Sequence, residues 1–381
     1  MPKWRAQKQT ERSYSSVLIS VKNADKGDQK PFECDLHFNL WKCANNRFML
    51  DCGVMLYDID YTGQADKNHT FKSIVLYVPQ RCKKDDISDL GKLLNDNTDL
   101  VSTVFNAFYK QSSGPDKSSM KSYENKEGNP QSFYLYALGE TDIHPLDSEG
   151  CQGSFYEFSI AIPEELKANV FNLYIRFRIQ INSKEGMAFL KHDEHIANNV
   201  LQAAFSRMEL YDGRFNDIRD TDDKIYQQLT DKKRFDCSLV KMRKVHFFFM
   251  TDAKDHVSNG NMDRMDTRML ETDKWKKYIG EDTQHAFVAY HWKKSAEKEQ
   301  NKATLPSFEV FFRDTCDNAN YWLIASYIAL ALALGTSGSL LSTINFSQSI
   351  NWTAILTNAI FYLGKSSVSC PLKPSDSAPL C

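Results

Sequence analysis

The chain has 381 residues, of which 42% are hydrophobic and 25% charged, so it is long enough to bury a sizeable apolar core. Its formal net charge of −2 argues against a dedicated nucleic-acid-binding protein, because such proteins usually present a basic surface. The nine cysteines include no C-x-x-C pair, which excludes a zinc ribbon and a thioredoxin-type motif.

The start of the chain, residues 1–13, is polar and basic and has no apolar core after it. We therefore expect no secretory signal peptide, and we expect the soluble part of the protein to lie in the cytoplasm. Cysteines in that compartment stay reduced, so we interpret them as structural.

The first region, residues 1–110, is predicted to be β-rich with one helix. Runs of β-branched and aromatic residues predict strands at Val17–Val21, Phe48–Tyr61 and Phe71–Val78. Four apolar residues at helical spacing predict a helix over Asp86–Tyr109, namely Ile87, Leu90, Leu93 and Leu94. The polar stretch 111–132 is rich in Ser, Gly and Pro, and we interpret it as a linker or a long loop.

A second α+β region is predicted over residues 133–317. Its expected strands are Phe133–Leu138, Phe155–Ile162, Phe171–Ile181, Val245–Met250, Ala286–Trp292 and Phe308–Phe312. A helix is expected over Asp193–Leu210. The predicted fold class is therefore α+β, a β-rich cytosolic region with mainly antiparallel sheets and few helices, joined to a C-terminal hydrophobic helical hairpin.

Apolar and polar residues alternate most clearly along Phe171–Ile181, which predicts a strand with one packed and one solvated face. Arg176 and Arg178 fall on the polar face. Two guanidiniums on one rigid face can bind phosphate or carboxylate bidentately, so they are the ligand-binding candidates. The alternative is an ordinary solvated sheet face.

Residues 318–364 contain no charged residue, and we expect them to form a transmembrane or re-entrant helical hairpin with a disordered tail over 365–381. Small residues permit close packing of helices in lipid, and we assign this role to Ala325, Ala329, Ala333, Gly335 and Ser337. Asn358 in the second limb would need a hydrogen-bond partner there. The alternative is a hairpin buried in a soluble core or an oligomer interface.

Two pairs of residues are candidate metal ligands. His192 and His195 are three residues apart at an expected helix start, where they would share a face. Asp58 and Asp60 are two apart on an expected strand, where paired carboxylates can hold a divalent ion. The plainer interpretations are a helix cap and the acidic end of a strand.

Two basic-aromatic patches are candidates for contact with an anionic surface such as lipid headgroups. The first is His246 with Arg243 and Lys244, and the second is His291–Lys294. The sequence has no phosphate-binding loop, no dinucleotide-binding fingerprint and no nucleophile elbow, so we expect no cofactor and no enzyme of these classes.

These features predict a membrane-anchored sensor and effector, in which a cytosolic domain controls an oligomerising, membrane-disrupting hairpin at the inner (cell) membrane. In plan this resembles bacterial antiphage effectors that join a recognition domain to a short membrane module, although no motif identifies a family. The expected partners are the lipid bilayer, further copies of the chain, and a protein or small anionic ligand on the cytosolic domain. The alternatives are a membrane-tethered binding or scaffold protein and a membrane-bound metal-dependent hydrolase.

Overall fold

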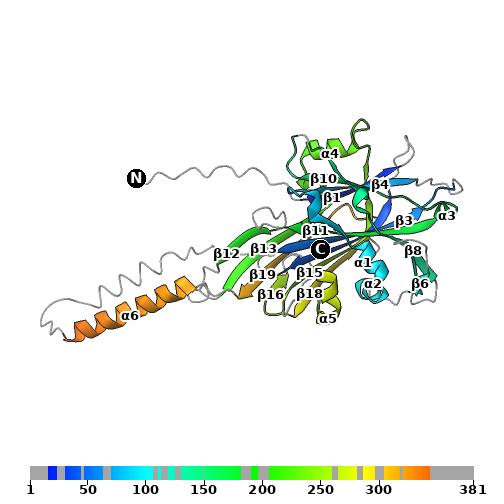
Figure 1. Cartoon of the computed structure of the whole chain (residues 1–381). Coiled ribbons are helices and arrows are strands. Elements are labelled where there is room, and N and C mark those ends of the chain that lie inside the picture. Colours follow the sequence, from blue (N-terminus) through cyan, green and yellow to red (C-terminus); the bar gives the residue numbers. More distant parts are fainter. Residues whose placement is uncertain are drawn as a thin grey trace, which may run out of the picture. The chain divides into compact units, whose positions relative to one another are not determined.

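The computed structural model describes residues 16–23, 31–43, 47–62, 70–105, 110–112, 119–124, 130–148, 150–181, 190–195, 206–259, 265–280, 286–296, 304–317 and 321–343. The chain divides into two compact units, Met1–Ala319 and Asn320–Cys381. The first unit holds two large sheets with short helices on their outer faces (Figure 1).

The first sheet has nine strands. Along its main path the order is β16 (His256–Asn259), β19 (Phe308–Asp317), β13 (Ser206–Phe215), β1 (Ser16–Asn23), β4 (Phe71–Val78), β10 (Ser154–Ser159) and β9 (Ile143–Leu146). Off this path, β12 (Leu190–His195) pairs with β13, and β14 (Ser238–Leu239) pairs with β1.

The second sheet has ten strands. Its main path is β17 (Asp266–Met269), β18 (Phe287–Ser295), β15 (Lys241–Asp252), β2 (Glu33–Lys42), β3 (Phe48–Ile59), β11 (Phe171–Ile181), β8 (Pro130–Tyr136), β7 (Ser119–Glu124) and β6 (Lys110–Ser112). The short strand β5 (Ile87–Asp89) also pairs with β11. This sheet takes strands from before residue 110 and from after residue 132, all within one compact unit.

The predicted β-rich character is confirmed. Most of the described strand pairs are antiparallel, but both sheets are mixed, since each also contains parallel pairing. Parallel pairs are β1 with β13, β2 with β15, and β8 with β11. Parallel neighbours need long crossover connections, and the partners in each pair are far apart in the sequence. The alternation of residues along a strand does not reveal such non-local pairing.

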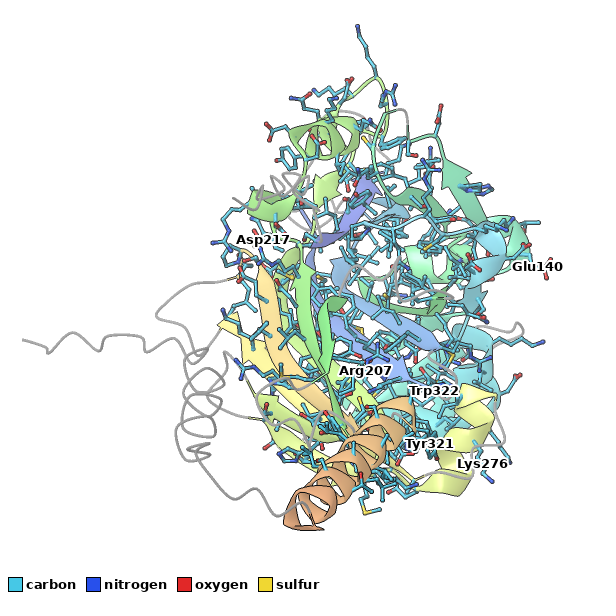
Figure 2. All side chains as sticks on the ribbon, turned by 90° about the vertical axis from the view of Figure 1, so that its left-hand side faces the viewer. Glu140, Arg207, Asp217, Lys276, Tyr321 and Trp322 are labelled. Atoms are coloured by element: carbon cyan, nitrogen blue, oxygen red, sulfur yellow. The ribbon has the colours of Figure 1, made fainter. Side chains whose placement is uncertain are left out.

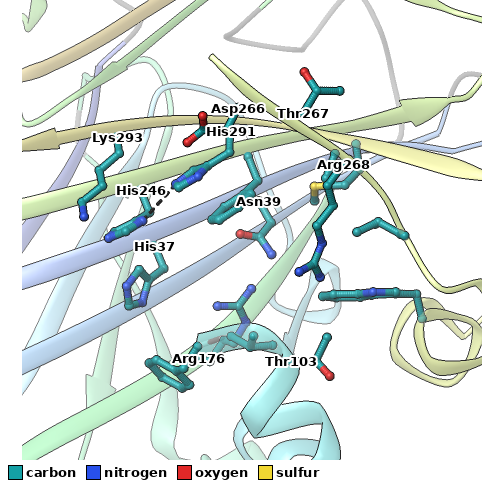
Figure 3. A pocket seen from close by; sticks show the side chains of 17 residues that line it. His37, Asn39, Thr103, Arg176, His246, Asp266, Thr267, Arg268, His291 and Lys293 are labelled. Atoms are coloured by element: carbon teal, nitrogen blue, oxygen red, sulfur yellow. Dashed lines mark hydrogen bonds between the residues drawn. The ribbon is translucent and has the colours of Figure 1, made fainter. Parts of the chain in front are cut away.

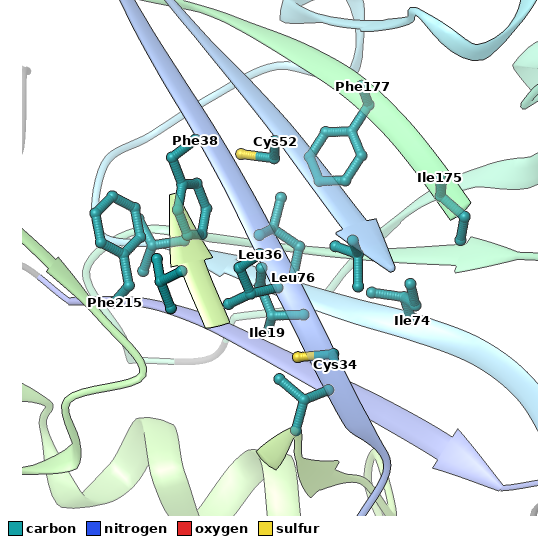
Figure 4. Packing of buried hydrophobic residues seen from close by; sticks show 14 of the residues in the cluster. Ile19, Cys34, Leu36, Phe38, Cys52, Ile74, Leu76, Ile175, Phe177 and Phe215 are labelled. Atoms are coloured by element: carbon teal, nitrogen blue, oxygen red, sulfur yellow. The ribbon is translucent and has the colours of Figure 1, made fainter. Parts of the chain in front are cut away.

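The two sheets share one apolar core. Phe38 from β2 stacks on Phe215 from β13 with ring centroids 3.8 Å apart, and Phe158 from β10 stacks on Phe177 from β11. Figure 4 shows the interior between Ile19, Leu36, Leu76 and their neighbours. Close packing of fully buried aromatic rings makes each one costly to truncate, by about 3–5 kcal/mol for Phe→Ala.

Helices cover the outer face of each sheet. On the ten-stranded sheet, α1 (Gly91–Asp96), α2 (Thr98–Phe105) and α5 (Thr272–Ile279) contribute to a second apolar cluster. On the nine-stranded sheet, α4 (Asp223–Thr230) inserts Ile225 and Leu229 into a third cluster. A further short helix, α3 (Glu164–Lys167), precedes β11. The outer face of β11 is therefore covered, and the predicted solvated face is wrong: Arg176 is fully buried and Arg178 is 5% exposed.

Two helix predictions are also wrong. Within Asp193–Leu210 the described residues belong to the paired strands β12 and β13, because pairing with β19 and β12 outweighs the local helical pattern. The segment Asp86–Tyr109 begins with a 3₁₀ turn (Lys84–Asp86) and β5, and only then forms α1 and α2. Two further 3₁₀ turns span Glu140–Asp142 and Ile218–Asp220.

The second unit contains α6 (Tyr321–Thr343) in its described part. Tyr321 and Trp322 at its start are 80% and 88% exposed (Figure 2). The predicted hydrophobic helical hairpin is wrong: the search of the described residues identified no helix with the length and apolar character that a membrane crossing requires. The predicted second limb and Asn358 lie outside the described residues.

Candidate functional site

A cavity of about 510 Å³ opens on the outer face of the ten-stranded sheet. Strands β2, β11, β15, β17 and β18 and helices α2 and α5 all contribute to its lining. Its polar lining residues are His37, Asn39, Thr103, Arg176, His246, Asp266, Thr267, Arg268, His291 and Lys293 (Figure 3). Its apolar lining residues are Val104, Phe105, Phe248, Met250, Leu270, Trp275 and Ala289.

Strand register brings the histidines together. His246 on β15 lies opposite His37 on the parallel strand β2, and Phe248 lies opposite His291 on the antiparallel strand β18. Because side chains alternate along a strand, residues two apart such as His37 and Asn39 face the same cavity. Residues far apart in the sequence therefore form one polar surface on a rigid sheet.

The three imidazoles form a continuous row. His246 Nδ1 lies 3.0 Å from His291 Nε2, which is a hydrogen bond in which one ring donates and the other accepts (Figure 3). The ring centroids of His37 and His246 are 5.1 Å apart. Phe248 stacks on His291 at 4.1 Å, so the row continues into an aromatic wall.

All three imidazoles are neutral near pH 7. Burial is the main cause that lowers the pKa of His246 to about 2, that of His37 to about 3 and that of His291 to about 4; nearby positive charges contribute to each shift, and Asp266 opposes it at His291. A general acid or base works best with a pKa near the operating pH. The imidazole row is therefore suited to hydrogen bonding with a ligand rather than to proton transfer.

Arg176 supplies a buried positive charge to the cavity. Its Nε donates to Tyr278 Oη at 2.6 Å and its Nη1 donates to Tyr174 Oη at 2.9 Å. With the Asn39 amide in its hydrogen-bonding orientation, the amide oxygen accepts from Arg176 Nη2 at 2.7 Å. These hydrogen-bond partners are all neutral, and the ion pair of Arg176 is a long one, with 3.9 Å between its Nη2 and the Asp51 carboxylate that it shares with Arg178.

Gly53 on β3 explains why the Arg176 and Tyr174 side chains fit across the sheet. It lies directly opposite Arg176, and a Cβ atom there would lie 2.2 Å from Tyr174 Oη and 3.1 Å from Arg176 Nη1. Any larger residue would displace these side chains, so a glycine is required by this close approach.

Arg178 does not line the cavity. Its Nε and Nη2 donate to the two carboxylate oxygens of Asp51 at 2.6 and 3.1 Å, and its Nη1 donates to the carbonyl of Tyr278. Asp51 also accepts a hydrogen bond from Trp41 Nε1 and lies 3.9 Å from Arg176 Nη2. The single carboxylate is therefore committed mainly to Arg178, and of the two predicted arginines only Arg176 reaches the cavity.

Two buried polar atoms of the lining have no hydrogen-bond partner in the described part of the chain. One is the indole Nε1 of Trp275, a residue that is 6% exposed, and the other is Nδ1 of His37. An unsatisfied buried donor costs about 1–3 kcal/mol. A bound ligand that accepts a hydrogen bond from the indole would remove this cost.

The charged groups of the lining are predominantly cationic. Arg176, Arg268 and Lys293 contribute positive charge, and Asp266 contributes the negative charge. Arg268 is 48% exposed and lies 4.0 Å from Glu271, so it stands at the solvent side of the site. The cavity therefore favours an anion, with one fixed cation at depth and further cations nearer to solvent.

One cluster among the described residues has donor atoms close enough together to hold a metal ion: Glu209, Asp314 and Cys316. Lys42 Nζ lies 2.5 Å from Asp314 Oδ2 and 3.1 Å from Glu209 Oε2. The Lys42 ammonium group thus lies among these donor atoms, where its positive charge offsets the carboxylates as that of a metal ion would.

The metal candidates from the sequence are not brought into a common site. His192 and His195 lie in strand β12, so the helical spacing on which the hypothesis depended is absent. Asp58 is exposed and has a left-handed backbone with φ of 56°, whereas Asp60 is 1% exposed and accepts hydrogen bonds from the Thr62 amide and hydroxyl. The shared strand face is lost because β3 becomes irregular opposite Phe171–Leu173.

The five residues that the sequence predicts to pack helices together in lipid are all exposed within the second unit. Ala325, Ala329, Ala333, Gly335 and Ser337 all lie on α6. The hydroxyl of Ser337 donates to the Ala333 carbonyl one turn earlier, which satisfies it within the helix. Their proposed packing role stays a prediction.

Sequence reasoning identified parts of the cavity but not their assembly. The sequence places His246 and His291 in two separate basic-aromatic patches, whereas the structure joins them through a hydrogen bond. His37 and Asn39 were missed, although Asp35, His37 and Asn39 alternate with buried apolar residues along β2. The signal in the sequence is this alternation itself, which places a row of polar residues on one face of β2 and apolar residues on the other.

Comparison with known proteins adds no relative. No family model matches the chain, and no curated protein sequence matches it.

Proposed function

We propose that the β-rich unit is a receptor domain that binds a small anion carrying a planar ring, of the size of a nucleoside monophosphate. The observation that carries this proposal is Arg176, which is fully buried, faces a cavity, and is held there by neutral hydrogen-bond partners. A buried cation without full neutralisation is costly, and an anionic ligand removes the cost.

The size of the cavity supports a small molecule. A volume of about 510 Å³ falls inside the range of roughly 300–1,000 Å³ that is usual for ligand sites. A guanidinium binds phosphate and carboxylate groups with two parallel hydrogen bonds. The anionic group of the ligand is thus expected at Arg176, with Arg268 and Lys293 adding attraction from the solvent side.

The aromatic lining supports a planar ring. Phe105, Phe248 and Trp275 supply flat apolar surfaces, and Trp275 Nε1 supplies a buried donor. The neutral imidazole row offers both donors and acceptors, which suits the polar edge of a heterocycle. This combination favours a ring with polar edges over a simple alkyl chain.

The test is isothermal titration calorimetry of the full-length chain with the four common nucleoside 5′-monophosphates, with inorganic phosphate and with the parent nucleosides. We expect at least one monophosphate to bind, and we expect Lys293→Gln and Arg268→Gln each to weaken binding about tenfold, the equivalent of about 1.4 kcal/mol. Trp275→Phe keeps the ring but removes the indole donor, and it should weaken binding while leaving the fold intact.

A matched control is Arg243→Gln. Arg243 lies on β15, is 40% exposed and lies outside the cavity lining, so its loss changes the net charge without changing the site. Equal weakening by Arg243→Gln would show that binding is only non-specific charge attraction. Absence of binding by every compound, or binding of inorganic phosphate as tight as that of the monophosphates, would contradict the proposal.

This proposal keeps one part of the function predicted from sequence, namely that the β-rich domain binds a small anionic ligand. The cell-membrane location, the bilayer and oligomer partners and the antiphage role stay predictions. Fractionation of cells that express the full chain, beside a truncation ending at Asp317, tests the location directly. Recovery of both proteins in the soluble fraction would contradict it.

A further inference from the structure

Lys42 and Cys316 lie closer together than unmodified side chains normally do. Lys42 ends β2 on the face toward the nine-stranded sheet, and Cys316 lies on β19 of that sheet. The distance from Lys42 Nζ to Cys316 Sγ is 2.6 Å. An N–H···O hydrogen bond is about 2.7–3.2 Å long, and sulfur is a larger acceptor than oxygen, so an N–H···S bond is longer still.

The distance between Lys42 Nζ and Cys316 Sγ matches that of a nitrogen and a sulfur joined through one bridging atom. One oxygen atom that is bonded to both the nitrogen and the sulfur holds these two atoms at about this distance, whereas a direct N–S bond would bring them much closer. Cys316 is a free cysteine in the described structure, so its sulfur is available for such chemistry.

We propose that Lys42 and Cys316 form a reversible covalent N–O–S bridge in the presence of dioxygen, which makes this pair a redox-dependent modification site between the two sheets. The reaction balances with one dioxygen for each bridge. One N–H bond, the S–H bond and the O–O bond break, and N–O and O–S bonds form. The second oxygen atom leaves as water with the two hydrogens. Nitrogen and sulfur each lose two electrons, and dioxygen gains four.

The surrounding carboxylates supply the proton acceptor that the step needs. The ammonium of Lys42 must lose one proton before its nitrogen can react, and Asp314 Oδ2 lies 2.5 Å from it. Burial raises the pKa of Asp314 to about 6, but Asp314, Glu209 and Asp255 also hold the pKa of the Lys42 ammonium well above its usual value, so the proton transfer is uphill. Asp314 Oδ1 has no hydrogen-bond partner within the described residues, so the protonated acid has a free oxygen on which to carry the proton.

The same environment makes the reaction slow. Burial raises the pKa of the Cys316 thiol to about 12, and the thiolate is the reactive form of cysteine. The bridge is therefore expected to accumulate during prolonged exposure to air rather than to act as a rapid peroxide sensor.

A bridge at this position would join strands that serve different parts of the fold. β2 also carries His37 and Asn39, which line the cavity, and β19 is paired with β13 and β16 in the other sheet. Covalent linkage of Lys42 to Cys316 would fix the end of β2 relative to the nine-stranded sheet. The oxidised protein is therefore expected to resist unfolding better than the reduced protein.

Mass spectrometry of the full-length wild-type chain tests the proposal. The protein is purified under dithiothreitol and then equilibrated with air, and its intact mass is followed. We expect a gain of one oxygen atom minus two hydrogen atoms, and a tryptic digest should contain a cross-linked peptide that joins Lys42 to Cys316. Dithiothreitol should reverse both changes, with two molecules oxidised to their disulfides and the bridging oxygen leaving as water.

Lys42→Arg and Cys316→Ser should each abolish this mass change. Cys82→Ser is the matched control, because Cys82 is also partly buried but contacts Gln80 instead of a lysine, and this variant should still form the bridge. No mass change in wild type, a gain of two or more oxygen atoms on Cys316 alone, or persistence of the bridge mass in Lys42→Arg would overturn the proposal. The wild-type measurement decides the question even if a variant fails to fold.

Discussion

Two buried ionic clusters lie on opposite faces of the same part of the ten-stranded sheet, and their excess charges have opposite signs. The guanidinium cluster contains Arg176 and Arg178 with the single carboxylate of Asp51. The carboxylate cluster contains Glu209, Asp255 and Asp314 around Lys42. Adjacent residues of β2 serve the two clusters, since Trp41 donates to Asp51 and Lys42 binds the carboxylates.

The difference between the clusters lies in how each can relieve its excess charge. Carboxylates can take up protons, and the pKa of Asp314 is already raised to about 6 by burial. Guanidiniums do not lose their protons in proteins. The carboxylate cluster can therefore adjust to its environment by titration, whereas the guanidinium cluster needs an anion, and this is the physical reason for placing the ligand at Arg176.

The largest expected effect is that of Asp51→Asn. It keeps the shape of the side chain but leaves two buried guanidiniums without their carboxylate, which should lower the free energy of unfolding by about 3–5 kcal/mol. Because the guanidiniums do not titrate, the loss should be the same from about pH 5 to about pH 8. Urea unfolding followed by tryptophan fluorescence measures it.

The control for this prediction is Glu164→Gln in the exposed pair Glu164–Lys167, whose side chains are 85% and 35% exposed. Loss of such a surface pair should cost no more than about 0.5 kcal/mol. If Asp51→Asn costs as little as the control, the guanidinium cluster is not the constrained site described above, and the argument for an anionic ligand at Arg176 fails with it.

The next largest effect is expected for Lys42→Met. The variant removes the ammonium from three carboxylates, but Lys42 is 12% exposed and the carboxylates can bind protons. The cost at about pH 8 should therefore be near 2–3 kcal/mol, below that of a fully buried pair. Unlike the loss in Asp51→Asn, it should diminish as the pH is lowered to about 5, and urea unfolding at both pH values makes the comparison.

The contrast between the clusters also shows what sequence can and cannot predict here. The strands were found because apolar residues alternate strongly, as along Phe171–Ile181, which the structure reproduces with the same bounds. The exposure of Arg176 and Arg178 was predicted wrongly because alternation identifies two faces but does not reveal that α5 covers the second one. Lys42 gave no signal at all, since its partners Asp255, Asp314 and Cys316 are more than 200 residues away.

The smallest expected effect is the pH dependence of stability that Asp314 causes in the carboxylate cluster. The folded protein holds the proton of Asp314 more tightly than the unfolded chain does, because burial raises its pKa from 3.8 to about 6. Below about pH 6 the folded state therefore binds more protons than the unfolded state, so this group adds stability as the pH falls from about 7 toward 4 and adds none above that window.

The contribution of Asp314 should reach about 1–2 kcal/mol, because a shift of one pKa unit corresponds to about 1.4 kcal/mol and the neighbouring acids share the proton. Asp314→Asn should remove this part of the pH dependence, whereas Asp212→Asn, at a carboxylate that forms an ordinary ion pair with Arg214, should leave it unchanged. Equal pH dependence in wild type and Asp314→Asn would mean that the cluster does not titrate in this window. The two clusters would then differ in the sign of their excess charge but not in their ability to take up protons. Only the cavity would then support Arg176 as the ligand site.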